Sequence, residues 1–199
     1  MYLMTLKGLI YEFPSIYDFI LNILHGKHLS ERYEFIANEI GKNKKVLEVG
    51  CGTCMLSSFL HKSNKYFGID DNDKSLNYAS KKRGVKNLIK SNIFNFSKYP
   101  KVDVIVACDV LHHIYPKHEY FLNKLMTKSK KVIVCEPFGG GIGGLFDSDG
   151  INKNDSDNGP IGWGKRFSEK QNVVDFFKTF NSQKIKLTKH NIIAVLGKI

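Results

Sequence analysis

The feature that most constrains the fold of this chain is an alternation of short apolar runs with helix-like segments between residues 45 and 135. Strands are predicted at 45–49, 66–69, 87–90, 102–107 and 131–135, with helices between them at 53–61, 73–83 and 116–129. The strands are apolar at most positions, which is typical of parallel strands covered by helices on both faces. The sequence therefore predicts an α/β fold with a doubly wound, mostly parallel sheet.

The rest of the chain is arranged around this core. The 199 residues are enough for a single domain with a substantial apolar interior. Residues 1–44 are expected to form a helical preface, and residues 45–136 the core. Residues 137–166 hold nine of the seventeen glycines, which predicts a long, mobile lid loop. Residues 167–199 are expected to add a helix and two closing strands, giving seven strands in all.

Several local signals predict where helices begin and which faces they bury. Apolar residues at helical spacing predict one apolar face in the first preface helix: Ile16, Phe19, Ile20, Ile23 and Leu24. Ser30 is expected to cap the second helix, and Pro116 to occupy the first turn of a later one. Ser168 and Gln171 have the spacing of a capping box and predict the start of the last helix.

Composition excludes several classes of protein. Four cysteines are too few for a disulfide-stabilised scaffold, and no apolar run approaches the roughly 18 residues of a membrane span. The first ten residues lack the basic start and cleavage site of a secretion signal. A cytoplasmic location is therefore expected.

The net charge of +11 leaves two interpretations open. A strongly basic chain is compatible with nucleic acid binding. However, only three of the 30 cationic residues are Arg, the side chain best suited to phosphates and base edges. A solvated, lysine-rich surface is therefore the favoured interpretation, and a functional basic face is the alternative.

The most informative segment is the glycine turn that follows the first predicted strand. Gly50 and Gly52 allow the backbone to turn tightly and a ligand to approach the backbone. Asp70 follows twenty positions after Gly50, at the end of the second strand, where an acid can bind both hydroxyls of a ribose. Each feature alone is also compatible with a structural turn or a helix cap, but together they favour a nucleoside cofactor.

These segments resemble the motifs of a known enzyme family. Glu48–Cys54, with the sequence EVGCGTC, resembles motif I of class I S-adenosylmethionine (SAM)-dependent methyltransferases. Gly68–Ala79 resembles their second motif, and Ser91–Ile93 occupies the place of their adenine-binding segment. Asp109–Ile114 resembles the fourth-strand motif of the ubiquinone/menaquinone-type small-molecule methyltransferases. The resemblance implies a Rossmann-like fold, SAM as the cofactor and methyl transfer as the reaction.

The resemblance also implies roles for individual residues. Gly50, Cys51 and Gly52 would line the methionine and ribose part of SAM, next to Glu48 of the same motif. Asp70 would bind the ribose, Asp71 would flank the adenine, and Asn92 and Ile93 would bind its edge. Asp109 would lie near the sulfonium. Two positions depart from the pattern: Cys54 replaces the third glycine of motif I, and Asn92 replaces the usual aspartate. For each of these residues a turn or cap role is the alternative.

Candidate catalytic and acceptor-binding residues come from three segments. His112 and His113 are the candidate general bases, because histidine titrates near neutrality, and a structural position at a helix start is the alternative. Trp163 in the lid is expected either to close over the acceptor or to anchor the loop. Tyr11 and Tyr17 of the preface are expected to form the opposite wall of the acceptor site.

A small molecule is the expected methyl acceptor. An RNA or protein acceptor is the alternative, and it is disfavoured because Asp109–His112 lacks the Asn/Asp-Pro-Pro-aromatic motif of many nucleic-acid methyltransferases. Lesser alternatives are a non-catalytic SAM-binding subunit and a C-x-x-C oxidoreductase using Cys51 and Cys54. No metal ion is expected. The sequence does not specify an oligomeric state.

Overall fold

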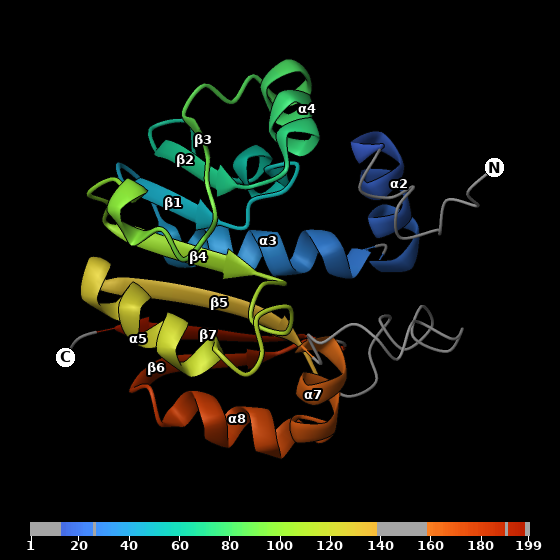
Figure 1. The fold of residues 1–199 in the computed structure, drawn as a ribbon, viewed down its shortest axis with the longest axis vertical. Helices are drawn as coiled ribbons and strands as arrows, with labels where there is room; N and C mark the ends of the chain where they lie inside the picture. The colour runs from blue at the N-terminus through green and yellow to red at the C-terminus, as the bar shows by residue number, and fades with distance from the viewer. Residues whose placement is uncertain (1–12, 26, 139–158, 190, 198–199) are drawn as a thin grey trace. The chain divides into compact units, whose positions relative to one another are not determined.

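The computed structural model describes residues 13–25, 27–138, 159–189 and 191–197, and Figure 1 shows its helices and strands. The chain forms two compact units, residues 1–100 and 101–199. Seven strands make a mostly parallel sheet with helices, which confirms the predicted Rossmann-like α/β fold. Among the described residues, no helix is both long and apolar enough to span a membrane.

Unit 1 contains three parallel strands in the order β3-β2-β1. They are β1 (Lys45–Val49), β2 (Lys65–Asp70) and β3 (Leu88–Lys90). The register pairs Val49 with Ile69 and Asp70 with Lys90. The carboxyl ends of the three strands therefore meet at one edge of the sheet, as the sequence predicted.

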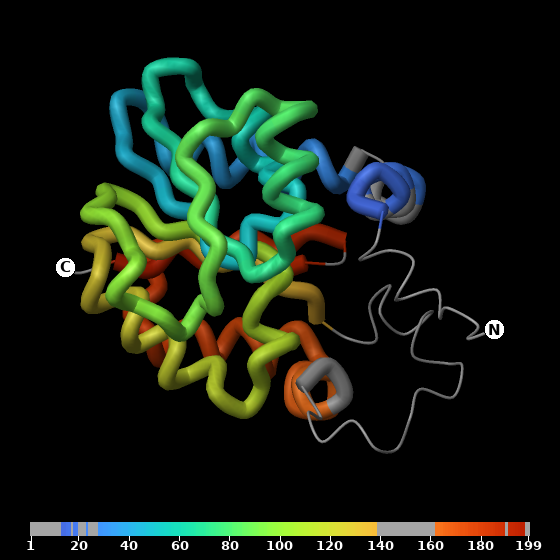
Figure 2. Tube along the Cα trace, turned by 45° about the horizontal axis from the view of Figure 1, so that its top comes forward, coloured from blue at the N-terminus to red at the C-terminus, as the bar shows by residue number. Residues whose placement is uncertain are grey.

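The helices of unit 1 follow the predicted order. They are α2 (Pro14–His25), α3 (Lys27–Ile40), the 3₁₀ helices η1 (Met55–Ser58) and η2 (Phe96–Lys98), and α4 (Asp73–Arg83). The α2 helix packs against α3 and α4 (Figures 1 and 2). The start of α4 is capped by Asn72, whose side chain accepts from the Lys74 and Ser75 N–H groups. Gly84 ends it in the left-handed region, at a φ of 66°.

Two expectations for unit 1 are wrong. The helix predicted at 53–61 is reduced to the single 3₁₀ turn η1. Ser30 does not cap α3, because this helix already begins at Lys27. Phe19 and Ile23, on the predicted apolar face of α2, are 65% and 63% exposed. Helical spacing identified an apolar face correctly, but which residues of a surface helix are covered depends on the elements that it packs against.

Unit 2 contains four strands in the order β4-β5-β7-β6. They are β4 (Val104–Cys108), β5 (Lys131–Pro137), β6 (Ser182–Leu187) and β7 (Asn191–Gly197). The β4 and β5 strands are parallel, whereas β7 runs antiparallel to both β5 and β6. The helices of this unit are α5 (His118–Lys128), α7 (Gly159–Arg166) and α8 (Lys170–Lys178).

The structure also corrects the expectations for unit 2. Residues 159–166 of the expected lid loop form α7, and residues 139–158 lie outside the described part of the chain. Pro116 precedes α5 instead of opening it. The Ser168–Gln171 capping box does not form: Glu169 occupies the N-cap position, and the Gln171 side chain donates to Asp175 instead. Side chains of Ser, Gln and Glu have several partners within reach, and the local packing selects among them.

A buried carboxyl group lies in the core of unit 1. Glu48 of β1 is 3% exposed, and it accepts a short hydrogen bond from the Tyr66 hydroxyl group. Burial raises the pKa of Glu48 to about 8, against the opposing effect of the Tyr66 hydrogen bond. At neutral pH the side chain is therefore mostly a neutral carboxylic acid in the folded protein.

This shift predicts how stability depends on pH. Between the ordinary pKa of 4.5 and about 8, the folded chain keeps a proton that the unfolded chain releases, so stability falls as pH rises through this window. Glu48→Gln stays neutral and removes this loss. We expect the variant to raise the free energy of unfolding by about 4 kcal/mol at pH 8 and by less than about 1 kcal/mol at pH 5.

Urea denaturation at the two pH values measures this effect. Glu34→Gln on the exposed surface of α3 is the matched control and should change neither value. An equal effect of Glu48→Gln at both pH values would contradict the assignment of a neutral, buried carboxyl group.

Candidate functional site

The turn after β1 is held by backbone hydrogen bonds to the end of β2. The Gly50 and Cys51 N–H groups both donate to the Ile69 carbonyl oxygen, at 2.8 and 3.1 Å. Gly50 and Gly52 have φ angles of 64° and 48°, in the left-handed region that favours glycine. Among the described residues, and apart from the two chain neighbours of Gly52, no heavy atom lies within 4 Å of the position that a Cβ atom on Gly52 would take. The turn therefore presents open backbone at the carboxyl edge of the sheet.

Asp70 is the acidic group of this turn. Its Oδ2 atom accepts from the Gly52 N–H group at 2.8 Å, and its Oδ1 atom accepts from the Asn72 N–H group at 2.9 Å. Burial raises the pKa of Asp70, and these two hydrogen bonds act against the shift. Each carboxylate oxygen has a further lone pair. The residue thus offers an oriented pair of acceptors beside the open face of Gly52.

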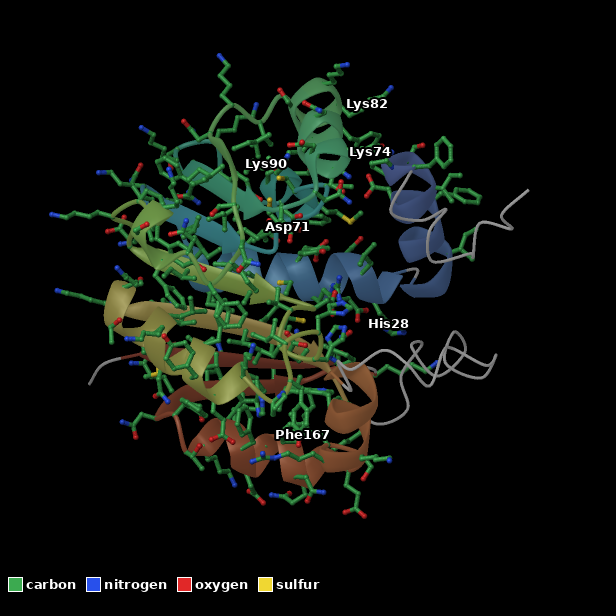
Figure 3. All side chains as sticks on the ribbon, in the orientation of Figure 1. His28, Asp71, Lys74, Lys82, Lys90 and Phe167 are labelled. Carbon is green, nitrogen blue, oxygen red and sulfur yellow. The ribbon has the colours of Figure 1, made fainter. Side chains whose placement is uncertain are left out.

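The end of β3 brings the predicted adenine-binding residues to the same edge. The Ser91 N–H group donates to the Asp70 carbonyl oxygen at 2.9 Å, which places Asn92 and Ile93 directly after this contact. The Asn92 Oδ1 atom accepts from the Phe94 N–H group at 2.9 Å. Asp71 is exposed at the end of β2 (Figure 3). Seven predicted cofactor residues are therefore gathered by the strand register alone: Gly50, Cys51, Gly52, Asp70, Asp71, Asn92 and Ile93.

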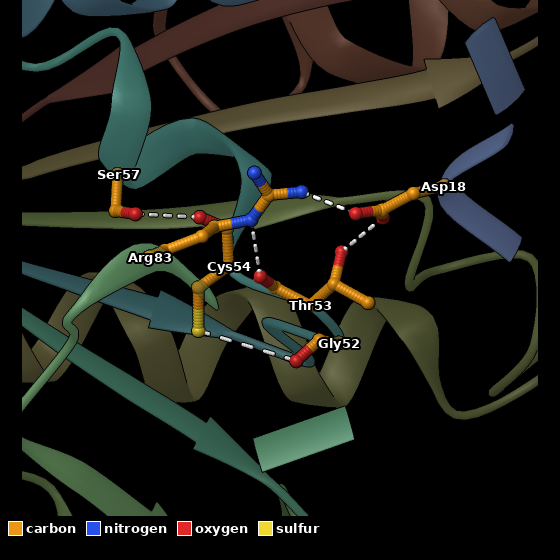
Figure 4. Close-up of polar contacts among 6 residues, drawn as sticks. All are labelled: Asp18, Gly52, Thr53, Cys54, Ser57 and Arg83. Carbon is orange, nitrogen blue, oxygen red and sulfur yellow. Dashed lines mark hydrogen bonds and ion pairs between the residues drawn. The ribbon is translucent and has the colours of Figure 1, made fainter. Parts of the chain in front are cut away.

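A buried polar cluster beneath this turn was not predicted from the sequence. Asp18 of α2 accepts from the Thr53 hydroxyl group at 2.6 Å and pairs with Arg83 of α4 (Figure 4). The Arg83 Nε–H group also donates to the Thr53 carbonyl oxygen at 2.8 Å. Asp18 is only 8% exposed. The cluster ties α2 and α4 to the turn. Its members are far apart in the chain, so no local spacing signals it.

In unit 2, the segment after β4 is organised by Glu136. This carboxylate is fully buried, and its Oε1 atom accepts from the Val110 and Leu111 N–H groups, both at 2.8 Å. Its Oε2 atom lies 2.8 Å from the His112 Nδ1 atom. Asp109 precedes this segment with a left-handed φ of 56°, and its N–H group donates to the Cys135 carbonyl oxygen at 2.8 Å.

The two candidate bases differ in their surroundings. His112 is half-buried and held by Glu136, whereas His113 is exposed and packs its ring against that of His112 in a tilted arrangement, with centroids 4.0 Å apart. A carboxylate acceptor at Nδ1 assigns the proton of a neutral His112 to Nδ1 and leaves Nε2 as an acceptor. Sequence reasoning missed Glu136, although an acidic residue near the end of an otherwise apolar strand is a usable signal.

The predicted acceptor-binding residues are placed unequally. Tyr11 lies outside the described residues, and Tyr17 belongs to α2. Trp163 of α7 is 3% exposed, and its indole N–H group donates to the Pro137 carbonyl oxygen at 3.0 Å. Its ring packs against those of His118 and Phe167. This arrangement favours the anchoring alternative, because the ring is already covered by the core of unit 2.

Two further points concern metals and cysteines. Within the described parts of the chain, no three His, Cys, Asp or Glu side chains are grouped so that they could hold a metal ion. All four cysteines are free thiols and buried. Cys108 and Cys135 are register partners on the neighbouring strands β4 and β5, and both are buried as core residues are.

Known proteins of the same fold carry out methyl transfer. A SAM-dependent methyltransferase from Aquifex aeolicus is 20% identical, with a TM-score of 0.51 over 82% of this chain and 87% of its own. The plantazolicin methyltransferase BpumL, solved with S-adenosylhomocysteine (SAH), is 14% identical, with a TM-score of 0.60 over 98% and 91%. The 16S rRNA methylase ArmA is 12% identical, with a TM-score of 0.59 over 97% and 90%. At these identities the likeness shows the fold alone.

Comparison of the sequence with family models shows more than the fold. A search of curated proteins found no similar sequence. A family model described as "Methyltransferase domain", however, matches residues 40–159, which is more than half of the chain and includes β1–β5. This match covers the turn after β1, Asp70, Asn92 and the Glu136–His112 pair. It confirms the enzyme class that the motif resemblance predicted: this chain belongs to the methyltransferase domain family.

Proposed function

We propose that this chain transfers a methyl group from SAM to a small-molecule acceptor that loses a proton in the reaction. The observation that carries the cofactor assignment is the Asp70 carboxylate. Two backbone N–H groups already orient it beside an open glycine turn. When a hydrogen-bonding carboxylate is oriented before the ligand arrives, binding costs less free energy to order it.

The residues of unit 1 fit a nucleoside bearing a charged amino acid. Asp70 would accept from the two ribose hydroxyls through its remaining lone pairs. The Asn92 amide and the backbone at Ile93 would bind the adenine edge, and the Gly50–Gly52 turn would line the methionine part. When bound, SAM supplies a methyl group on a sulfonium, which is activated for in-line displacement. The role of the protein is then alignment and charge placement.

His112 is the proposed general base. Its Nδ1–H group donates to Glu136, so Nε2 is the ring nitrogen that would take the proton that the methyl acceptor loses as it becomes nucleophilic. Glu136 is a positioning residue: it holds the tautomer and stabilises the imidazolium that forms. A base of this kind serves an acceptor with an O–H or N–H group. Asp109 stays a predicted cofactor residue on the motif resemblance alone.

The proposal of a small-molecule acceptor rests on the segment after β4. Asp109–Ile114 resembles the corresponding segment of the ubiquinone/menaquinone-type enzymes and lacks the Pro-Pro-aromatic motif of many nucleic-acid methyltransferases. RNA is the second candidate. It is favoured by the net charge of +11 and by the similarity in fold to a 16S rRNA methylase.

The first test concerns the cofactor. We expect Asp70→Ala to weaken SAH binding by about 10- to 100-fold, since a hydrogen bond to a charged group contributes about 1.5–3 kcal/mol. Isothermal titration calorimetry measures this affinity. Asp73→Asn is the matched control: its carboxylate lies three residues away, but it pairs with Lys90 on the surface. Equal SAH affinities of the wild type and Asp70→Ala would mean that Asp70 has only a structural role.

The second test concerns the acceptor and the base. Tritium-labelled SAM is incubated with the enzyme and a cell extract separated into a low-molecular-mass filtrate, total RNA and protein. We expect label in the filtrate. With that fraction as substrate, His112→Ala should lower kcat about 10²- to 10⁴-fold and leave SAH affinity unchanged. His113→Ala is the control and should stay near wild type. Label in ribonuclease-sensitive material would instead establish RNA as the acceptor.

A further inference from the structure

The sequence of the cofactor turn contains two cysteines that methyl transfer does not require. Cys51 and Cys54 begin and end the same four-residue turn, which is closed by a hydrogen bond of 2.7 Å from the Cys54 N–H group to the Cys51 carbonyl oxygen. In such a turn the first and last Cα atoms are less than about 7 Å apart. Cα atoms joined by a disulfide are usually about 4.4–6.8 Å apart. The backbone therefore already has the dimensions of a disulfide-linked turn.

The side chains of the two cysteines also point to one place. Both Sγ atoms lie 4.0 Å from the Gly52 carbonyl oxygen. Both also lie over Gly68 of β2: a Cβ atom there would be 2.8 Å from the Cys51 sulfur and 3.2 Å from the Cys54 sulfur. Gly68 thus leaves room for the thiol pair, and both sulfurs lie close to one point above this glycine. Cys54 has a left-handed φ of 57°, a conformation that cysteine rarely adopts.

We propose that Cys51 and Cys54 form a reversible disulfide by exchange with oxidised low-molecular-weight disulfides, and that this bond weakens cofactor binding. The second half of this inference rests on the proposed function, because the disulfide closes the turn whose Gly52 N–H group orients Asp70. A disulfide draws the sulfurs to about 2.05 Å and fixes the torsion angle about the new bond. Because Gly52 lies between the two cysteines, fixing this torsion angle is proposed to change the direction of the Gly52 N–H group enough to weaken its hydrogen bond to Asp70.

The exchange is balanced in atoms and electrons. The Cys51 thiolate attacks one sulfur of the small disulfide and displaces the other as a thiolate, which gives a mixed disulfide. The Cys54 thiolate then attacks the Cys51 sulfur and displaces the second small thiol. Two protein thiols lose two electrons, one small disulfide becomes two thiols, and both cysteine protons end on those thiols. Cys51 reacts first, because it is 6% exposed whereas Cys54 is fully buried.

The surroundings of the thiols affect the rate rather than the product. Contact with the Cys54 thiol, and then burial, raises the pKa of Cys51. The thiolate is the attacking species, so exchange is slow at neutral pH and accelerates at alkaline pH. The redox measurement must therefore be carried to equilibrium over hours.

The experiment incubates the full chain in glutathione buffers of graded ratio, quenches with acid, alkylates free thiols and maps peptides by mass spectrometry. We expect a Cys51–Cys54 linked peptide, 2 Da lighter than the reduced peptide, that disappears with reductant. The double variant Cys108→Ser/Cys135→Ser should form the same link. Cys54→Gly, which restores the glycine of motif I, should form none. Thiols that stay alkylatable in the most oxidising buffer would overturn the proposal, as would a stable glutathione adduct on Cys51.

A second measurement tests the consequence for the cofactor. We expect the oxidised chain to bind SAH at least tenfold more weakly than the reduced chain, and Cys54→Gly to bind equally in both buffers. Equal affinity of the two wild-type forms would overturn the effect on binding. Failure of the reduced chain to bind SAH would instead reject the proposed function, and the peptide map would still decide whether the disulfide forms.

Discussion

The hydrogen bond from the Gly52 N–H group to the Asp70 carboxylate, 2.8 Å long, joins the two parts of the candidate cofactor site. It forms because Gly50 and Gly52 adopt left-handed backbone angles that direct the N–H group at the end of the neighbouring strand. The same turn is fixed from behind by two donors to the Ile69 carbonyl oxygen. Without this geometry the acid and the open backbone would not meet at one edge of the sheet.

The polar cluster of Asp18, Thr53 and Arg83 supports this turn from the side of the preface. Burying a charged pair costs free energy unless its hydrogen bonds are satisfied, and here Asp18 receives donors from both partners while Arg83 also binds a carbonyl oxygen. Removing one member would leave a buried charge unpaired. The cluster therefore specifies where α2 and α4 lie relative to the turn more than it adds to stability.

In unit 2, backbone N–H groups also orient a carboxylate, and this carboxylate contacts a histidine. Glu136 is fully buried and accepts from two backbone N–H groups, so its orientation is set before it meets His112. Preorganised carboxylates of this kind hold a histidine in one tautomer. The aromatic packing of Trp163 with His118 and Phe167 attaches α7 to the same unit and places the indole in its core.

The strand-helix alternation, the turn at Gly50–Gly52 and the acid at Asp70 could all be predicted from the sequence. They depend on local patterns: apolar period, glycine placement and the length of the strand-turn-strand unit. Helix ends were predicted less well. Ser30 and the Ser168–Gln171 pair were expected to cap helices, but these helices begin at neighbouring residues. Residues 159–166 were expected in a loop because glycine is a poor helix former, yet they form α7, whose Trp163 is buried.

The sequence by itself determined the fold class, the edge of the sheet at which the candidate cofactor residues gather and, through the family match, the enzyme class. Only the tertiary structure decided the partners of the polar side chains. Asp18 with Arg83, Glu136 with His112, and Cys51 with Cys54 over Gly68 are brought together by packing. The reason is physical: the spacing of apolar residues in the sequence specifies which face of a helix or strand is buried. The partner of a buried polar group depends on the three-dimensional positions of elements distant in the chain.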